Sequence, residues 1–477
     1  MSLRIFDSFS RRKVDFEPRE AGKASVYVCG PTVQNSPHIG HVRTFMAFDV
    51  VRRYLTWAGY QVKFVRNITD IDDKIIARAR EHNEDTLAFA ARYAEEFNRA
   101  MAAVHILPPD SEPRVTQHIP QIVALIERLV AKGTAYASGG DVYFSVDKFA
   151  DYGKLSGQSI EDLQAGARVE PGEPSWDSPW GKGRPGWHIE CSAMCIAQLG
   201  DSFDLHGGGK DLIFPHHENE IAQSQGATGP GTFARYWLHA GFLNLNEEKM
   251  SKSLGNVVGV WDMVARHDAE ALRLFYMLTH YRSPLNFEMI ERGEEIVFVG
   301  VEDAEKRLDY FYTTLSRIDD FLGANTAVEA GAVLPEADAL RGKLAAAMDD
   351  DFNSALAIAE LGEAAKLANK LLDEPKGVAK DVRKRTLARL RVEMYDFGLR
   401  ALGLFNQPPR AFLSARRERL CKLHKIDAAW VEGELRARDE ARKAKDFARA
   451  DAVRATLRER GVEVMDTPRG AEWRITE

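Results

Sequence analysis

The fold class follows from residues 25–65, whose sequence is SVYVCGPTVQNSPHIGHVRTFMAFDVVRRYLTWAGYQVKFV. Residues 25–28 form a short apolar run, which predicts a buried strand, and Gly30 begins the turn that ends it. Apolar side chains recur every four positions over 40–60, which predicts a helix with one buried face. Residues 62–65 predict a second strand. A strand, a helix and a strand within about 40 residues form a βαβ unit, so the strands are expected to be parallel with a right-handed crossover.

The texture of the sequence changes several times beyond this unit. Two groups of prolines, at 108–109 and 171–185, bracket a region that contains the strand-like residues 141–146. Residues 301–404 are rich in Ala, Leu, Glu, Lys and Arg with helical spacing, which predicts a helix bundle. The fold class that we predict is α/β, with a doubly wound, Rossmann-like parallel-sheet domain over 1–100 and 186–258, an insertion over 101–185, a further region over 259–300, an α-helical bundle over 301–406 and a small C-terminal domain over 407–477.

The composition excludes several classes of protein. The chain has 477 residues, 45% hydrophobic and 28% charged, which is ordinary for a soluble globular protein of about three domains. No apolar run reaches the roughly 18 residues that a membrane span needs, and the start has no apolar stretch long enough for a secretion signal. Four cysteines are too few for a disulfide scaffold, so a cytoplasmic location is expected, and clustered cysteines indicate a metal first.

Charge is distributed unevenly along the chain. The net charge is −7, yet residues 410–477 contain 17 Lys and Arg against 13 Asp and Glu, a net +4 that leaves −11 for the remainder. A mildly basic end on an acidic protein is compatible with a nucleic-acid contact. On charge alone, a solvated helical surface is the favoured interpretation.

Two hydrophilic motifs could bind phosphate. The sequence His38-Ile39-Gly40-His41 lies between the first strand and the first helix, where helix N-termini in an open parallel sheet offer free N–H groups to ligands. Residues 248–256, EKMSKSLGN, carry Lys249 and Lys252, which could neutralise a triphosphate. Each motif alone could be an ordinary surface turn. The two motifs together, about 200 residues apart, resemble the two signatures of the class I aminoacyl-tRNA synthetases.

This resemblance implies a reaction and residue roles. Class I synthetases activate an amino acid with ATP and then esterify it to the terminal adenosine of tRNA, chemistry that needs positioning and charge stabilisation at the α-phosphate. By resemblance, His38 and His41 stabilise the α-phosphate. Lys249 and Lys252 hold the departing pyrophosphate together with Mg²⁺. In the segment HGGGKD, Asp211 would accept hydrogen bonds from the ribose hydroxyls.

A second group of residues has the composition of a metal site, and its members are Cys29, Cys191, His216 and Glu220. Two sulfurs, one nitrogen and one oxygen suit Zn²⁺. The histidine and the glutamate are four positions apart at the start of a predicted helix, so one helix face would carry both. From spacing alone, His217 or Glu218 could take a ligand position. Buried cysteines beside an ordinary polar helix start remain a further alternative.

With the synthetase signatures, the set resembles the cysteinyl-tRNA synthetases position by position, over nearly the whole chain. The matching motifs are residues 29–33 (CGPTV), 67–70 (NITD), 183–188 (GRPGWH) and 216–220 (HHENE). The resemblance implies one Zn²⁺ per chain on the four residues above, ATP with Mg²⁺, L-cysteine and tRNA(Cys) as partners, and a monomer. It also implies a connective peptide over 101–185, a stem-contact region over 259–300, and a cysteine pocket lined by Gly30, Thr69, Trp187 and His216.

Zinc would determine the choice of amino acid. Cysteine differs from serine by one atom, and a pocket that reads shape alone discriminates poorly between near-isosteres. A soft metal ion binds a thiolate and lowers the pKa of a thiol, whereas a serine hydroxyl is a poor ligand. We therefore predict that the chain has no hydrolytic editing site, and that Cys195 and Cys421 are structural.

The C-terminal end resembles the anticodon-binding module of the same family, in residues 441–451 and 465–474. Proteins that read RNA sequence favour unstacked bases, contacted by aromatic, arginine and carboxylate groups. The candidates are Arg442, Asp451 and Asp466 for base contacts, and Arg449 and Arg454 for phosphate contacts. An amphipathic helix followed by a capping strand, with no RNA role, is the alternative.

The function implied by these resemblances is ATP-dependent activation of L-cysteine and its transfer to tRNA(Cys). The nearest alternative is the ligase that joins cysteine to an amino sugar in mycothiol synthesis, which lacks an anticodon module. A non-catalytic tRNA-binding paralogue would have no need of intact His38, His41, Lys249 and Lys252. A simpler nucleotidyltransferase would have no need of a thiol-selecting metal.

Overall fold

The computed structural model describes residues 2–158, 173–246, 248–249, 258–292, 295–323, 329–374, 377–467 and 470–475. The chain forms two compact units. Unit 1 comprises Met1–Leu308 and Ala324–Leu404, and unit 2 comprises Asp309–Gly323 and Phe405–Glu477.

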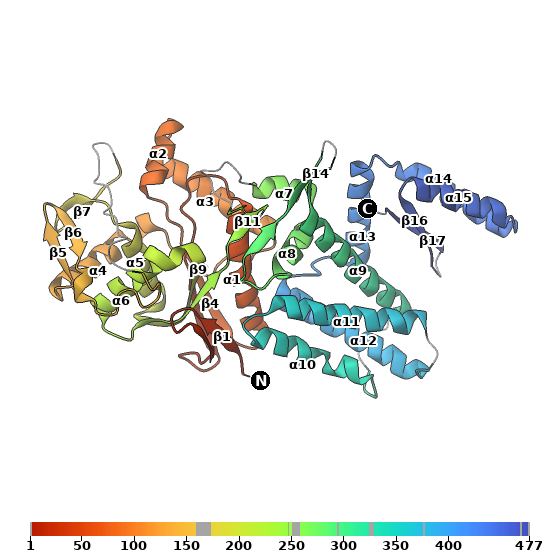
Figure 1. The fold of residues 1–477 in the computed structure, drawn as a ribbon, viewed down its shortest axis with the longest axis horizontal. Helices are drawn as coiled ribbons and strands as arrows, with labels where there is room; N and C mark the ends of the chain where they lie inside the picture. Colours follow the sequence, from red (N-terminus) through yellow and green to blue (C-terminus); the bar gives the residue numbers. More distant parts are fainter. Residues whose placement is uncertain are drawn as a thin grey trace. The chain divides into compact units, whose positions relative to one another are not determined.

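Unit 1 is built on a four-stranded parallel sheet with the order β10-β9-β3-β4. Figure 1 labels β9 and β4 in this sheet. Its elements are β3 (Lys23–Val28), α1 (Ile39–Trp57), β4 (Gln61–Arg66), β9 (Ser202–Gly209) and β10 (Phe233–Ala240). The first three confirm the predicted strand, helix and parallel strand. The chain passes from β3 to β4 on one side, and β9 then pairs with the other edge of β3. The crevice between the carboxyl ends of β3 and β9 is therefore the topological switch point, where open α/β sheets bind ligands.

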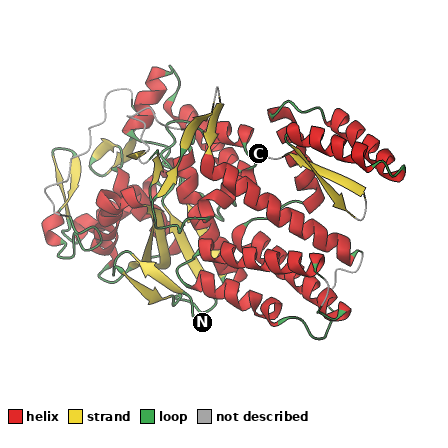
Figure 2. Cartoon of the chain, turned by 45° about the vertical axis from the view of Figure 1, so that its right-hand side comes forward, coloured by secondary structure: helices red, strands yellow, loops and turns green. Residues whose placement is uncertain are grey.

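Helices cover both faces of this sheet, which confirms the doubly wound fold (Figure 2). Successive residues of β9 point to opposite faces. A Cβ on Gly207 would lie 2.2 Å from the ring of Phe48 on α1, whereas a Cβ on Gly208 would lie 2.9 Å from the ring of His217. The second face is covered by α5 (Trp187–Leu199) and α6 (Glu218–Thr228), which share a buried apolar cluster with the strands.

The remaining elements of the first 300 residues flank the sheet. They are the hairpin β1 (Arg4–Asp7) and β2 (Arg12–Asp15), α2 (Asp73–Glu81), α3 (Thr86–Ala103), α4 (Ile119–Ala131), the hairpin β5 (Ala135–Ser138) and β6 (Asp141–Phe144), the hairpin β7 (Trp176–Ser178) and β8 (Gly181–Gly183), β11 (Leu243–Leu245), β12 (Glu248–Lys249), α7 (Val260–Arg266), α8 (Ala269–Met277), β13 (Leu285–Phe287), β14 (Met289–Arg292) and β15 (Glu295–Phe298). The strand expected over 141–146 is β6.

Helices dominate the rest of the chain. They are α9 (Val299–Leu322), α10 (Pro335–Asp349), α11 (Ser354–Asp373), α12 (Lys380–Phe397), α13 (Pro409–Leu423), α14 (Ala428–Lys443) and α15 (Phe447–Glu459), and a final hairpin is formed by β16 (Val462–Thr467) and β17 (Gly470–Ile475). The last part of α9 belongs to unit 2 rather than to the bundle of unit 1. In unit 2, Leu420, Leu457 and Trp473 are buried in a core of its own. Among the described helices, none has the length and hydropathy of a membrane-crossing segment.

Candidate metal centre and phosphate-binding segments

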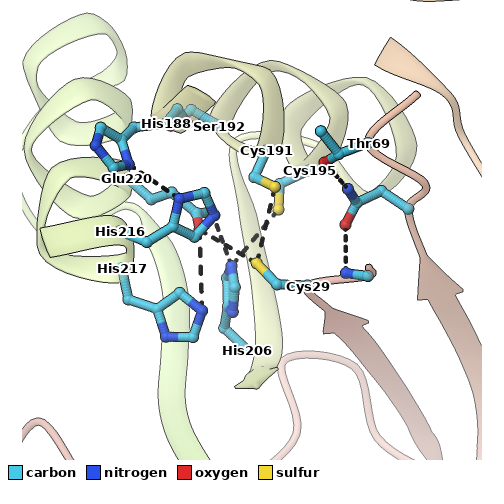
Figure 3. Close-up of polar contacts among 12 residues, drawn as sticks. Cys29, Thr69, His188, Cys191, Ser192, Cys195, His206, His216, His217 and Glu220 are labelled. Carbon is cyan, nitrogen blue, oxygen red and sulfur yellow. Dashed lines mark hydrogen bonds and ion pairs between the residues drawn. The ribbon is translucent and has the colours of Figure 1, made fainter. Parts of the chain in front are cut away.

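The four candidate metal ligands come together at the carboxyl end of β3 (Figure 3). Their ligand atoms all lie within 4.8 Å of one another, and all four residues are buried. The sulfurs of Cys29 and Cys191 are 3.8 Å apart, although the two residues are 162 positions apart in sequence. Glu220 Oε1 lies 3.3 Å from the sulfur of Cys29 and 3.0 Å from His216 Nε2.

The backbone places each ligand. The N–H of Cys29 donates to the carbonyl of Gly207, which ties the end of β3 to β9. The next residue must be glycine, because a Cβ on Gly30 would lie 1.6 Å from the carbonyl oxygen of Asn67. His216 belongs to the irregular turn Ile213–His217 that leads directly into α6, so it lies one turn before Glu220.

The electrostatics of this cluster favour a cation. The hydrogen bond from Cys29 lowers the pKa of the Cys191 thiol to about 6, and His216 contributes to the shift. Burial alone would lower the pKa of His216, but Glu220 and Cys191 raise it to about 10. Burial would raise the pKa of Glu220, but His206 and His216 hold it well below its usual range. The cluster therefore holds a thiolate and a carboxylate around one positive imidazole, and a metal cation would satisfy the same anions. The donor set fits Zn²⁺.

An overlapping set, Cys29, His206, His217 and Glu220, also lies within 4.8 Å. It shares two residues with the first, so one ion can use only one of them fully. Glu220 uses its two oxygens differently, because Oε1 faces His216 and Oε2 lies 2.9 Å from His206 Nε2. A ligating carboxylate is commonly held by a hydrogen bond to its second oxygen. This arrangement favours the first set as the ligands, with His206 as the residue that orients Glu220.

His188 and His206 are the polar neighbours that the sequence prediction missed. His188 Nδ1 lies 2.9 Å from His216 Nδ1, so it can fix the ring of that ligand with Nε2 turned toward the sulfurs. Strand parity could have identified His206, because it precedes Gly207 on β9 and points to the face opposite α1. No comparable sequence signal marks His188, which lies next to Trp187 in the quoted motif.

The predicted pocket residues lie beside the candidate metal ligands, and one of them, His216, is itself a candidate ligand. The N–H of Gly30 donates to Asn67 Oδ1 at 2.8 Å, and the amide of Asn67 reaches the hydroxyl of Thr69 at 3.4 Å. Trp187 stacks on His216 with a centroid separation of 4.3 Å, and 37% of Trp187 is exposed. An exposed aromatic face against a metal ligand is suited to be a pocket wall. The assignment of these residues to a cysteine pocket stays a prediction.

The histidine motif, the first of the two candidate phosphate-binding motifs, forms the start of α1. His38 is the N-cap residue, and its Nδ1 accepts from the N–H of Gly40, while His41 Nδ1 accepts from the N–H of His38. A ring that accepts at Nδ1 carries its proton on Nε2, so each histidine is a neutral Nε2–H donor. The rings stack at 3.8 Å between centroids.

Backbone hydrogen bonds join residues 258–260, which follow the lysine motif in sequence, to the histidine motif. The N–H of Ile39 donates to the carbonyl of Val258 at 3.1 Å, and the N–H of Val260 donates to the carbonyl of Pro37 at 3.2 Å. The backbone of Lys249 lies in β12. The side chain of Lys249 and the whole of Lys252 lie outside the described residues.

Asp211 lies beyond the carboxyl end of β9, on an exposed turn. A Cβ on Gly209 would lie 2.4 Å from its Oδ1, so glycine keeps the strand end open beside this carboxylate. The same Cβ would be 3.7 Å from Thr44 Oγ1 of α1. The carboxylate of Asp211 and the hydroxyl of Thr44 on α1 therefore both lie beside Gly209, which fits the predicted ribose contact.

In unit 2 the candidate base-reading residues lie on α14, α15 and β16. Asp466 accepts two bonds from Arg438, at 2.8 and 2.9 Å, and one from Arg442 at 2.8 Å. These contacts lower the pKa of Asp466 to about 2, with the hydrogen bond from Arg438 as the largest cause. Asp451 is exposed on α15. Arg438 was not predicted from the sequence, because a buried arginine on an amphipathic helix carries no periodic signal.

Comparison with known proteins gives consistent findings along the chain. Residues 15–293 match the tRNA synthetases class I (C) catalytic domain, residues 343–406 the DALR domain, and residues 431–474 the cysteinyl-tRNA ligase anticodon binding domain. The cysteine–tRNA ligase of Anaeromyxobacter sp. (strain Fw109-5) is 48% identical over 499 residues, with 100% of both chains covered. That of Geobacter sulfurreducens is 44% identical over 497 residues, again with 100% of both covered.

The solved structures support the fold. Mycobacterium tuberculosis methionyl-tRNA synthetase in complex with methionyl-adenylate matches with a TM-score of 0.58 at 17% identity. The match covers 80% of this chain and 92% of that one.

Proposed function

Since the chain belongs to the family of cysteine–tRNA ligases, within the class I aminoacyl-tRNA synthetases, we propose that its substrates are ATP, L-cysteine and tRNA(Cys). The observation that carries this proposal is the convergence of Cys29, Cys191, His216 and Glu220 at the switch point of the sheet, beside the histidine motif of α1. The candidate thiol-selecting residue Cys29 and the candidate phosphate-binding residue His38 both follow the carboxyl end of β3, which supports a shared site.

The reaction has two steps. In the first, a carboxylate oxygen of cysteine attacks the α-phosphorus of ATP, the bond to the β-phosphate breaks, and pyrophosphate leaves. His38 and His41 would donate their Nε2–H groups to the α-phosphate as its charge develops. Lys249 and Lys252 would hold the pyrophosphate, which Mg²⁺ accompanies. In the second step, a ribose hydroxyl of the terminal adenosine attacks the carbonyl of the adenylate, and AMP leaves.

The four clustered ligands would hold one zinc ion. Bound there, zinc supplies a soft Lewis acid that takes a thiolate in preference to a hydroxyl. The chain's own part is to hold that site rigid, through His188 on His216 and His206 on Glu220. Trp187 and Thr69 would then bound the space left for the side chain of cysteine.

The anticodon-binding match over 431–474 favours tRNA over the amino-sugar acceptor of the mycothiol ligase. The decisive experiment is ATP–pyrophosphate exchange with cysteine and with serine, followed by transfer to tRNA(Cys). Cysteine-dependent exchange with charging supports the proposal. Exchange without charging would favour the amino-sugar ligase, and absence of exchange would exclude both.

Asp451→Ala should weaken charging and leave exchange intact. The side chain is exposed, so its loss should not disturb the core of unit 2. A base contact is typically worth about 1–3 kcal/mol, so kcat/KM for tRNA(Cys) should fall by about 10–100-fold. The matched control is Glu459→Ala, an exposed carboxylate on the same helix. Equal losses in exchange and charging would contradict a role for Asp451 in reading tRNA.

A further inference from the structure

Arg43 is a buried residue that the reaction described above does not use. It lies on α1, two positions after His41, and only 2% of it is exposed. Its guanidinium donates to four backbone carbonyls. They belong to Tyr276 at 2.9 Å, His280 at 2.9 Å, Tyr281 at 3.1 Å and Ser283 at 3.1 Å. Because all four acceptors are backbone carbonyls, this buried guanidinium fixes the backbone path of the segment to which it donates.

The segment 280–283 supports the strands that lead to Lys249. The N–H of Gly241 donates to the carbonyl of Tyr281 at 2.8 Å. Contact here is so close that a Cβ on Gly241 would lie 2.3 Å from the carbonyl oxygen of Ser283. Just beyond, β13 pairs with β11, and β11 pairs with β12, which contains Lys249. The position of 280–283 therefore influences the position of β12, the strand that contains the backbone of Lys249.

A second contact joins α8, the helix that contains Tyr276, to the histidine motif itself. The hydroxyl of Tyr276 on α8 donates to the carbonyl of Ile39 at 2.8 Å. Tyr276 is 1% exposed, and its own carbonyl accepts from Arg43. The start of α1 is thus bonded to Tyr276 of α8 through Ile39 and through Arg43, which flank His41 in sequence.

The far side of the segment is held by Asp351, in the turn between α10 and α11. This carboxylate accepts from Arg282 Nε at 2.5 Å and from the hydroxyl of Tyr281 at 3.0 Å. Its backbone has φ 65°, a left-handed conformation that is uncommon for a residue other than glycine. Segment 280–283 is therefore clamped between α1 and the bundle, and has little freedom to shift on its own.

We propose that Arg43 is a positioning residue for adenylate formation. It fixes the histidines of α1 and the strand carrying Lys249 to one support, segment 280–283, so that donors from both motifs reach the same triphosphate. This inference rests on the proposed function, because it assigns both motifs to ATP. Lysine cannot replace this role, since a single ammonium lacks the planar fork that reaches four carbonyls. A misplacement of about 1 Å far from the reacting atoms can cost about 10²-fold in rate.

The test compares Arg43→Lys and Tyr276→Phe with a control, Arg52→Lys. Arg52 lies on the same helix and donates to the carbonyl of Pro108 and the carboxylate of Asp110, away from both motifs. Cysteine-dependent exchange is measured per active site, with the KM for cysteine, the zinc content and the Tm. We expect Arg43→Lys to lower kcat by about 10–100-fold and Tyr276→Phe by a few-fold, with the KM for cysteine within about twofold. Arg52→Lys should leave kcat unchanged.

A purely structural role for Arg43 would lower the Tm and the active fraction while kcat per active site stayed at the wild-type value. That result would overturn the proposal. If Arg43→Lys does not fold, Tyr276→Phe decides alone, and an unchanged kcat in that variant overturns the proposal as well. Failure of the proposed function is distinct from both, because the wild-type protein would then show no cysteine-dependent exchange.

Discussion

Removing zinc should lower cysteine-dependent ATP–pyrophosphate exchange by about 10³-fold or more, and restoring zinc should recover it. The expected loss is large because the metal-free cluster pairs its thiolate and carboxylate with the His216 imidazolium and offers no soft cation to bind the thiolate of the substrate cysteine. Without the metal, nothing among the described pocket residues separates a thiol from a hydroxyl by more than shape. Preference for cysteine over serine should therefore collapse together with the rate.

Three variants identify the ligands in this experiment. Cys191→Ala should abolish the stoichiometric zinc measured by elemental analysis. Cys195 lies on the same helix and is equally buried, but its sulfur lies 3.8 Å from His206 Nε2 and outside the ligand cluster. The variant Cys195→Ala should therefore retain one zinc per chain. His217→Asn should also retain zinc if Cys191 and His216 are the ligands. Loss of zinc in His217→Asn but not in Cys191→Ala would favour the overlapping set instead. Intact selectivity in fully metal-free protein would refute the metal argument.

His38→Asn should lower kcat for exchange by about 10²–10³-fold, the usual cost of one lost donor to a developing negative charge. Asparagine is among the best N-cap residues, and its side-chain oxygen can accept from the N–H of Gly40 as His38 Nδ1 does. The substitution therefore keeps the start of α1 and removes only the Nε2–H donor. Exchange kinetics with saturating cysteine measure the loss.

The stability of this variant is the necessary control. Thermal unfolding of His38→Asn should match the wild type within a few degrees, whereas His38→Ala should lose about 1 kcal/mol from the missing cap. A fall in exchange confined to His38→Ala would mean that the histidine serves only as a helix cap.

Sequence periodicity was enough to predict the sheet around which the site is built. The apolar run at 25–28, the four-residue repeat over 40–60 and the run at 62–65 correspond to β3, α1 and β4, because local burial patterns reflect the faces that these elements present. The strand order could not be read in this way. Pairing of β3 with β9 joins residues about 180 positions apart, and only packing determines it.

The candidate site was likewise predictable only in part from the sequence. The motifs supplied the residue types, and the resemblance supplied the set of ligands, but spacing alone left His217 and Glu218 as alternatives. In the structure, Glu218 is not part of the ligand cluster, because its two carboxylate oxygens accept hydrogen bonds from the N–H groups of Gly153 and Ser156. Arg43 carried no signal at all, because it is one arginine among several on α1 and its partners are backbone carbonyls, which no sequence displays.

The alternation along β9 has an evolutionary consequence. Even-numbered residues at its end, His206 and Gly208, face the centre that would select the amino acid, and the odd-numbered Gly207 and Gly209 face the helix that would bind the nucleotide. Mutations at the even-numbered positions can thus alter the choice of amino acid while the nucleotide side of the sheet is inherited unchanged, and mutations at the odd-numbered positions can do the reverse. Insertion or deletion of a single residue there would exchange the two sets, so descendants of this scaffold should diversify here by substitution alone.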